Sequence, residues 1–148
     1  MGIDGCGLPT RLGWHIVQGE EIGRWVAKRI AGEFFAEGSS AIGLQKDGIT
    51  IAGVIYENWN RQSIFCHIAI EGRMTKGYLK AIFDYPFNVC KVKKIIVPVV
   101  SNHAKSIKLV TKMGFAEEAR LKDASLDGDI IFLTLAKENC RFLGVENG

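Results

Sequence analysis

The sequence lacks the features that define several classes of protein. Its apolar runs, such as residues 95–100 and 130–135, are far shorter than the roughly 18 residues of a membrane-spanning helix, so no membrane partner is expected. Its four cysteines form no C-x-x-C pair and its three histidines are scattered, which argues against a metal site. Residues 1–13 have neither the basic start nor the apolar core of a signal peptide. We therefore expect a reduced, soluble, cytoplasmic protein.

Positive charge exceeds negative charge only slightly. The 19 basic and 16 acidic side chains leave a net charge of +3, which makes a nucleic-acid partner unlikely on electrostatic grounds but suits an anionic small molecule. The 47% hydrophobic and 24% charged residues are typical of a folded globular chain. A length of 148 residues suits one domain. We predict a single domain over residues 1–148, in which residues 1–12 form a flexible N-terminus.

The first half of the chain predicts one strand, one helix and a three-stranded meander. Apolar residues recur at i, i+3 and i+4 from Ile22 to Phe34, which is the spacing of an amphipathic helix. Asp47-Gly48 between two apolar segments is a strong hairpin signal. The predicted elements are a strand at 14–17, a helix at 20–35, and strands at 41–45, 49–56 and 63–70.

The second half predicts two helices and three strands. Pro86 should end or kink the first of these helices, and Gly114 should end the second with Phe115 as the apolar contact beyond it. Ser101 or Asn102 can cap the second helix. The predicted elements are a helix from about residue 75, a strand at 94–100, a helix from about 103, strands at 115–122 and 129–136, and a short helical turn at 137–143.

The order β-α-β-β-β-α-β-α-β-β predicts an α/β protein with a mixed, mostly antiparallel central sheet and helices on both faces. Pro98 lies inside an apolar strand and has no N–H to donate to a ladder, so its strand must be unpaired there on one side. The apolar pattern predicts a central strand, whereas Pro98 requires a strand that is unpaired on one side. A central strand that separates from one of its neighbours meets both requirements. The gap between the two strands would suit an extended ligand.

Several local motifs carry a resemblance to a known family. Residues 102–120, N-H-A-K-S-I-K-L-V-T-K-M-G-F-A-E-E-A-R, resemble the fourth helix and sixth strand of the GNAT superfamily of acyl-CoA-dependent N-acetyltransferases. Residues 83–88, Asp129 and residues 138–143 resemble small bacterial and phage-borne members. The resemblance covers nearly the whole chain. It implies the GNAT fold and direct transfer of an acetyl group from acetyl-CoA, as co-substrate, to a primary amine.

The resemblance also implies where acetyl-CoA binds. Residues 72–77 lead into a helix and stand where the family binds the diphosphate, with Arg73 and Lys76 adding positive charge and Gly77 matching the last family glycine. The alternative is a solvated turn. Asn102 would meet the pantetheine arm, although it could equally be a helix cap. The residues expected to contact acetyl-CoA are Ile68, Ala69, Ile70, Arg73, Met74, Thr75, Lys76, Gly77, Tyr78, Asn102 and Ser106.

Three residues are candidates for the general base that accepts the proton of the amine. They are His67, Glu57 and Glu71. His67 has the best unperturbed pKa for work near neutral pH, but a hydrogen-bonded core histidine is an equal alternative. Glu57 and Glu71 could instead be solvated strand ends. A chain of water molecules could also take the proton.

The sequence departs from the family at two positions. Thr75 stands where the middle glycine of the diphosphate loop is expected, and Val110 stands where many members carry a tyrosine that protonates the leaving thiolate. These departures support an alternative function, a non-catalytic CoA-binding or regulatory module.

Other features leave the partners open. The lysines at 105, 108 and 112 share one helix face, which could be solvated or could contact the 3′-phosphate of CoA. The acceptor could be a protein N-terminus, a lysine, a polyamine or a small antibiotic. A homodimer through the closing strands or the tail at 141–143 is also compatible with the sequence.

Overall fold

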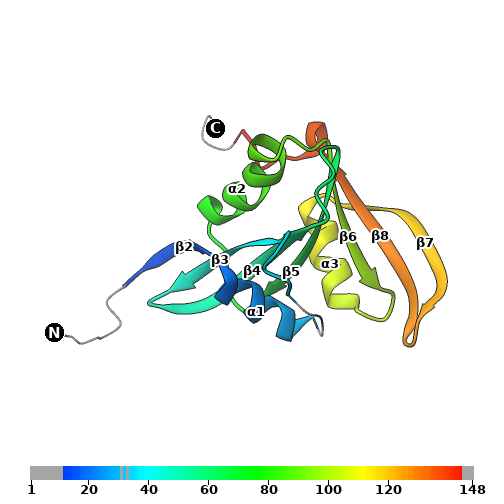
Figure 1. Cartoon of the computed structure of the whole chain (residues 1–148), viewed down its shortest axis with the longest axis horizontal. Coiled ribbons are helices and arrows are strands. Elements are labelled where there is room, and N and C mark those ends of the chain that lie inside the picture. The colour runs from blue at the N-terminus through cyan, green and yellow to red at the C-terminus, as the bar shows by residue number, and fades with distance from the viewer. Residues whose placement is uncertain (1–11, 31, 33, 145–148) are drawn as a thin grey trace. The chain divides into compact units, whose positions relative to one another are not determined.

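The computed structural model describes residues 12–30, 32 and 34–144 (Figure 1). It confirms the predicted order of elements, while the predicted flexibility of residues 1–11 lies outside the described residues. The strands are β2 (Trp14–Gln18), β3 (Ser40–Lys46), β4 (Ile49–Glu57), β5 (Ser63–Ile70), β6 (Lys94–Val100), β7 (Ala116–Ser125) and β8 (Gly128–Ala136). The helices are α1 (Glu20–Arg29), α2 (Lys76–Asp84), α3 (Ala104–Met113), a π-helical turn (Tyr85–Val89) and a 3₁₀ turn (Lys137–Asn139).

The strands form one mixed sheet, as predicted. They are hydrogen-bonded in the order β2-β3-β4-β5-β6-β8-β7. β5 and β6 are parallel, whereas the pairs β2–β3, β6–β8 and β8–β7 are antiparallel. The described chain divides into two compact units, the first running to Ile55 with Ile68–Tyr78 added, and the second comprising Tyr56–His67 and the chain from Leu79 onward. The single domain expected from chain length stays a prediction.

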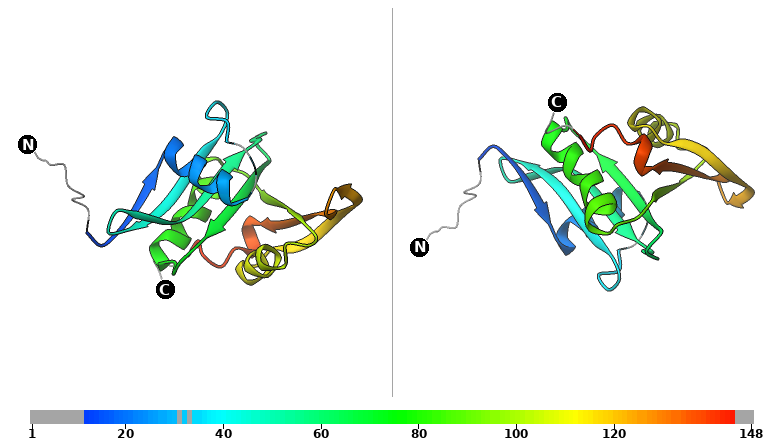
Figure 2. Two further views of the ribbon diagram at one scale, coloured as in Figure 1. Left: turned by 90° about the horizontal axis from the view of Figure 1, so that it is seen from below. Right: turned by 90° about the horizontal axis from the view of Figure 1, so that it is seen from above.

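In the first unit, α1 packs closely on β3 and β4 because two strand positions are glycine. A Cβ on Gly43 would come within 2.6 Å of the Ile22 side chain, and a Cβ on Gly53 within 2.6 Å of the Val26 side chain. Ile22 and Val26 are 2% and 0% exposed and form a core with Ala27, Ala41, Ile55 and Ala69. The absence of side chains at the two glycines therefore sets how near the helix lies to the strands (Figure 2).

The α1 helix is shorter than its apolar pattern predicts. It ends at Arg29, where the N–H of Ile30 donates to the carbonyl of Val26, rather than at Phe35. Phe34 packs against the same core although it lies beyond the helix, and its ring occupies the space that a Cβ on Gly23 would need. Phe34 therefore continues the helical spacing of apolar residues from outside the helix. This is why the apolar pattern predicted a helix that extends beyond Arg29.

The turn between β3 and β4 has the predicted hairpin form. Asp47 and Gly48 both have positive φ, 52° and 83°, as a two-residue type I′ turn requires. The carboxylate of Asp47 also accepts a hydrogen bond of 2.6 Å from the N–H of Gly13. The turn thereby links β3 to the residue that precedes β2.

In the second unit, β6 behaves as its proline predicts. It pairs with β8 along its whole length, but its register with β5 covers only residues 63–65 against 94–96. Pro98 lies two residues beyond the end of that pairing, so its missing N–H costs no ladder hydrogen bond there. Ile95, Val97 and Val99 are buried, whereas the residues that alternate with them are half-buried.

The boundaries of the later elements are partly as predicted. Gly114 ends α3 with a left-handed φ of 111°, and the buried Phe115 follows it. The predicted cap of α3 is wrong, because the helix begins after His103 with no side-chain cap. The Ser101 hydroxyl instead accepts a hydrogen bond from the N–H of Asp129 at 2.9 Å, joining the end of β6 to the start of β8.

Two further boundaries differ in detail. The α-helical part of α2 ends at Asp84 as Pro86 requires, and the chain continues through the π-helical turn. β7 runs three residues further than predicted, to Ser125, since its hairpin with β8 stays paired up to Ser125 and Gly128. No helix within the described residues is long and apolar enough to cross a membrane.

Candidate functional site

The turn that leads from β5 into α2 has the electrostatics of an anion site. Arg73 and Lys76 are both exposed, and the first turn of α2 carries no acidic residue. The first N–H groups of a helix have no partner within the helix, and the helix dipole adds partial positive charge at this end. Residues 72–77, which we call the phosphate turn, therefore have the charge that the predicted diphosphate site requires, and the binding itself stays a prediction.

Thr75 has a specific structural task in the phosphate turn. Its hydroxyl accepts a hydrogen bond of 3.1 Å from the N–H of Tyr78, three residues on, and so caps α2. Gly77 lies between them, and a Cβ placed there would meet no heavy atom within 4 Å. The N–H groups of Lys76 and Gly77 thus face no competing cap. Thr75, which stands where the resemblance predicts a glycine, therefore supplies a helix cap.

Tyr78, the predicted contact that directly follows the phosphate turn, is held in the core. Its side chain is 0% exposed, and its hydroxyl donates a hydrogen bond of 2.9 Å to the carbonyl of Ile42 in β3. Burial raises the pKa of this phenol well above its ordinary value. Because its N–H is taken by Thr75, Tyr78 offers a ligand neither backbone nor side chain.

Glu71, the third candidate base, is engaged in an ion pair. Its carboxylate oxygens accept hydrogen bonds from Arg29 Nε at 2.7 Å and Arg29 Nη2 at 3.3 Å. The Arg29 guanidinium also lies 3.8 Å from the centroid of the Trp25 ring. Glu71 is thus held by a residue of α1, and the 42 residues that separate the partners hid this pairing from local sequence patterns.

The strand segment before the phosphate turn can contact a ligand mainly through its backbone. Ala69 is 9% exposed and belongs to the core, while Ile68 and Ile70 are half-buried. Ala69 lies on the same face of β5 as His67, because Ala69 packs in the core with Ile55 of β4 and His67 contacts Glu57, two residues further along that strand. The side chains of β5 therefore alternate along its whole length, and what changes after Cys66 is which face holds the buried residue.

Two of the candidate bases meet in the second unit. The Nε2 of His67 in β5 lies 2.7 Å from Oε2 of Glu57 in β4, and the two side chains are 22% and 27% exposed. In the neutral imidazole, a proton on Nε2 donated to the carboxylate leaves the lone pair on Nδ1. A carboxylate that fixes the tautomer of a histidine is the arrangement of an oriented general base. The sequence named both residues but did not pair them.

The thiol next to His67 is not part of this chemistry. Cys66 is 3% exposed on the opposite face of β5, and burial, followed by Cys90 and Glu57, raises the pKa of its thiol. A thiol that stays protonated is a poor nucleophile. Among the residues that the structure describes, no group of three or more His, Cys, Asp or Glu side chains is arranged to hold a metal ion.

The residues predicted on α3 have mixed surroundings. Asn102 is exposed in the turn before α3, and no residue of the described chain forms a hydrogen bond with its amide. Ser106 is half-buried in the first turn of α3, whereas Val110 is 2% exposed in the core. Lys105, Lys108 and Lys112 are exposed. Asn102 is therefore available to a ligand, and nothing at residue 110 can donate a proton.

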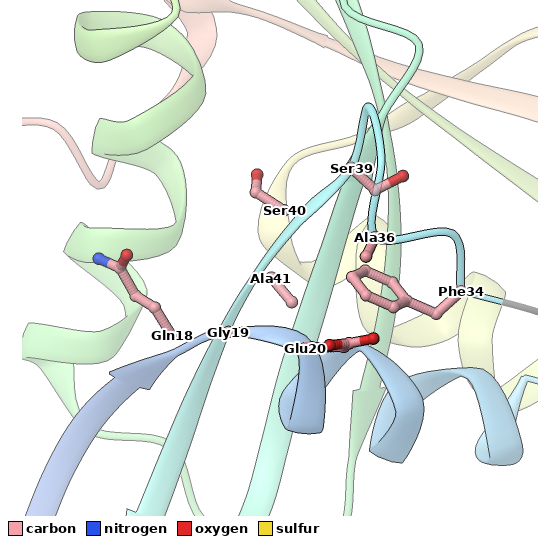
Figure 3. Close-up of a pocket in the computed structure, with 8 residues that line it drawn as sticks. All are labelled: Gln18, Gly19, Glu20, Phe34, Ala36, Ser39, Ser40 and Ala41. Carbon is pink, nitrogen blue, oxygen red and sulfur yellow. The ribbon is translucent and has the colours of Figure 1, made fainter.

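A cavity of about 270 Å³ lies elsewhere in the first unit, at the start of α1 (Figure 3). Its walls include Gln18, Phe34, Ser39 and the carboxylate of Glu20, which is already paired with Arg24. None of the predicted site residues lines it. The cavity is therefore separate from the residues predicted to contact acetyl-CoA.

Comparisons with known proteins give structural relatives only. No family model matches the sequence, and no curated protein sequence matches it significantly. The N-acetyltransferase PseH from Campylobacter jejuni, solved in complex with acetyl coenzyme A, aligns at a TM-score of 0.52 and 16% identity over 68% of this chain and 70% of its own. An N152L mutant of the spermidine N-acetyltransferase SpeG from Vibrio cholerae aligns at 0.64 and 15% identity over 90% of this chain and 98% of its own.

A third structural relative is described as a probable acetyltransferase. It aligns at a TM-score of 0.58 and 16% identity over 69% of this chain and 64% of its own, so this chain spans slightly less than two thirds of its length. At such identities the likeness shows the fold alone. The fold is that of the GNAT acetyltransferases.

Proposed function

We propose that this chain, built on the GNAT acetyltransferase fold, transfers an acetyl group from acetyl-CoA directly to a primary amine. The observation that carries the proposal is the phosphate turn. Arg73 and Lys76 are exposed there, and the first turn of α2 has no acidic residue. A Cβ at Gly77 would meet no heavy atom within 4 Å. The likeness to PseH, whose structure contains acetyl coenzyme A, supports the same co-substrate.

The proposed contacts with acetyl-CoA come from short segments of the chain. The N–H groups of Lys76 and Gly77, with Arg73, would bind the diphosphate. Backbone groups of residues 68–70 would hydrogen-bond the pantetheine arm, with the half-buried Met74 beside it. Asn102 and Ser106 would contact the same co-substrate from the start of α3.

The proposed chemistry needs one proton acceptor. The amine nitrogen attacks the thioester carbonyl carbon, a C–N bond forms, and the amine proton passes to Nδ1 of His67 while Glu57 holds the other ring nitrogen. The tetrahedral intermediate then breaks its C–S bond and expels CoA as a thiolate. The thiolate takes up the proton through His67 or water. Since a thiol has a pKa near 8.5, it can leave without the acid that Val110 does not supply.

Binding of the co-substrate tests the proposal directly. Acetyl-CoA at about 100 times its dissociation constant should add about 2.7 kcal/mol to the free energy of unfolding. That corresponds to a rise of roughly 5–10 °C in melting temperature for a domain of about 150 residues. Desulfo-CoA should produce a comparable rise, because it keeps the diphosphate. Absence of a thermal shift at millimolar acetyl-CoA, together with silent calorimetry, would refute the proposal.

A second candidate function is a CoA-binding module that does not catalyse. The buried Val110 in place of a proton donor favours it. Incubation with acetyl-CoA and a panel of amines, followed by mass spectrometry for the gain of one acetyl group, separates the two functions. Sedimentation of the same sample would measure the proposed self-association, for which the dodecameric SpeG of Vibrio cholerae is a precedent within this fold.

A further inference from the structure

One face of the second unit is apolar and half-exposed. Ile96, Pro98 and Val100 of β6 lie opposite Thr134, Phe132 and Ile130 of β8, and directly paired residues share one face of a sheet. All six are half-buried, in contrast to the alternating residues of the same strands. We call the apolar members of this face, with Phe65 of β5, the apolar platform: Phe65, Ile96, Pro98, Val100, Ile130 and Phe132.

Two aromatic rings form the centre of the platform. Phe65 is in register with Ile96, and its ring centroid lies 6.4 Å from that of Phe132 at an interplanar angle of 89°. This edge-to-face geometry is favourable between aromatic rings and leaves the face of one ring open to a third group. The platform is therefore a defined aromatic surface rather than scattered apolar residues.

The helices of the second unit lie on the other side of the strands. α3 is seen nearly end-on in both views of Figure 2, and it lies on one side of β8 and β7. α2 accepts a hydrogen bond at the Ile82 carbonyl from the hydroxyl of Tyr56, whose side chain points away from the face of its neighbour Glu57. Among the described residues of this unit, no helix covers the platform.

The paired base of the proposed reaction lies on the same face as the platform. His67 follows Phe65 by two residues, so both side chains are on one side of β5. The acidic groups on this face are already engaged, because Glu57 is bound by His67 and Glu118 accepts hydrogen bonds from Lys94 and Thr134. The face thus offers an apolar floor and a proton acceptor, without a free carboxylate for a second cationic group.

We propose that the apolar platform binds the body of the acceptor and delivers its amine to His67. The substrate class is then a primary amine that carries an aromatic or branched aliphatic body, rather than a polyamine such as spermidine. Binding sites for small molecules are mostly apolar with a few placed polar groups, which matches this face. The inference rests on the proposed acetyl transfer and names its acceptor.

The wild-type protein provides the first test. Acetyl transfer from acetyl-CoA is measured with 2-phenylethylamine, ethylamine and spermidine, each as a function of amine concentration. We expect kcat/KM for 2-phenylethylamine to exceed the other two by at least about tenfold, since even one methylene in an apolar site is worth roughly 10–200-fold. A preference for spermidine, equal use of all three amines, or no transfer to any of them while acetyl-CoA binds, would overturn the inference. Failure of acetyl-CoA to bind in calorimetry would instead refute the proposed function.

Variants provide the second test. Phe132→Ala should raise KM for 2-phenylethylamine about tenfold, as loss of a buried aromatic contact commonly does, with kcat and acetyl-CoA affinity unchanged. Phe35→Ala removes an aromatic ring that is 63% exposed in the first unit and should leave every constant unchanged. Melting curves check that both variants fold. Should Phe132→Ala fail to fold, the same measurements on Phe65→Ala replace it.

A second copy of the chain is the rival occupant of the platform. Sedimentation velocity of the wild type and of Phe132→Ala identifies it. A wild-type dimer that this substitution converts to monomer would show that the platform is a subunit interface and would overturn the inference. An assembly state that the substitution leaves unchanged agrees with an acceptor site.

Discussion

Replacement of Gly77 by aspartate should affect the stability of the fold and the affinity for acetyl-CoA in opposite directions, so that the two can be tested separately. Gly77 is the second residue of α2, its φ lies outside the left-handed region, and a Cβ there meets nothing within 4 Å. A carboxylate in the first turn of a helix stabilises by about 0.3–1 kcal/mol. We therefore expect the melting temperature of Gly77→Asp to stay level or rise by a few degrees, since roughly 1 kcal/mol corresponds to 2–4 °C at this size.

The same carboxylate should oppose the diphosphate strongly. Two unit charges about 4 Å apart near a protein surface repel with about 4 kcal/mol, which is close to a thousandfold in the dissociation constant. Calorimetry of acetyl-CoA at low ionic strength measures this loss, and added salt should reduce it. Stability and affinity are thus expected to change in opposite directions.

Two control variants isolate the cause. Gly77→Ala adds bulk without charge and should weaken binding far less than aspartate does. Gly144→Asp adds the same charge at another glycine where a Cβ meets nothing within 4 Å, and it should bind acetyl-CoA as the wild type does. A folded Gly77→Asp protein with wild-type affinity would show that the phosphate turn does not bind the diphosphate.

Four further predictions concern the paired base and the residues at the start of α2. His67→Ala should lower kcat by about 10²–10⁴-fold without changing acetyl-CoA affinity. Glu57→Gln keeps a hydrogen-bond acceptor and should lower kcat less. If both variants turn over at the wild-type rate, the base lies elsewhere. Thr75→Val should destabilise the fold by about 0.5–2 kcal/mol through loss of the helix cap, and Thr75→Ser should not, as denaturant titration will show. Tyr78→Phe should cost about 1–3 kcal/mol because the buried carbonyl of Ile42 loses its donor. Since burial raises the pKa of Tyr78, the wild type should also lose stability as pH rises above the ordinary phenol value near 10, where the unfolded chain ionises first, and Tyr78→Phe should lose less.

Local signals predicted the order of elements because each acts within a few residues. Asp47-Gly48 adopts the two positive φ angles of its turn, Gly114 ends its helix in the left-handed region, and Pro98 marks where β6 leaves β5. Such signals depend on steric limits of single residues. They therefore hold regardless of what packs around them.

Features set by tertiary contacts could not be predicted in this way. The helix at 20–35 was predicted too long because Phe34 reaches the core from a loop rather than from a helical turn. Ser101 was available as a cap but is used by Asp129, 28 residues away. The partners of the candidate bases likewise come from other strands or helices, so their residue types were recognisable in the sequence but their roles as partners were not.

The edge of the sheet at β7 has a consequence for handling the protein in acid. Lys94, aided by Thr134, lowers the pKa of Glu118, and the backbone N–H of Asp123, with Arg120, lowers that of Asp129. Carboxylates with lowered pKa values stabilise the fold at neutral pH and lose that contribution as pH falls. Loss of these exposed contacts should loosen β7 from β8 and make the backbone edge of an apolar strand more accessible, which is a template for intermolecular pairing. The ordinary pKa values of these two carboxyl groups are 4.5 and 3.8, so aggregation ahead of any loss of helical signal is expected only below these pH values.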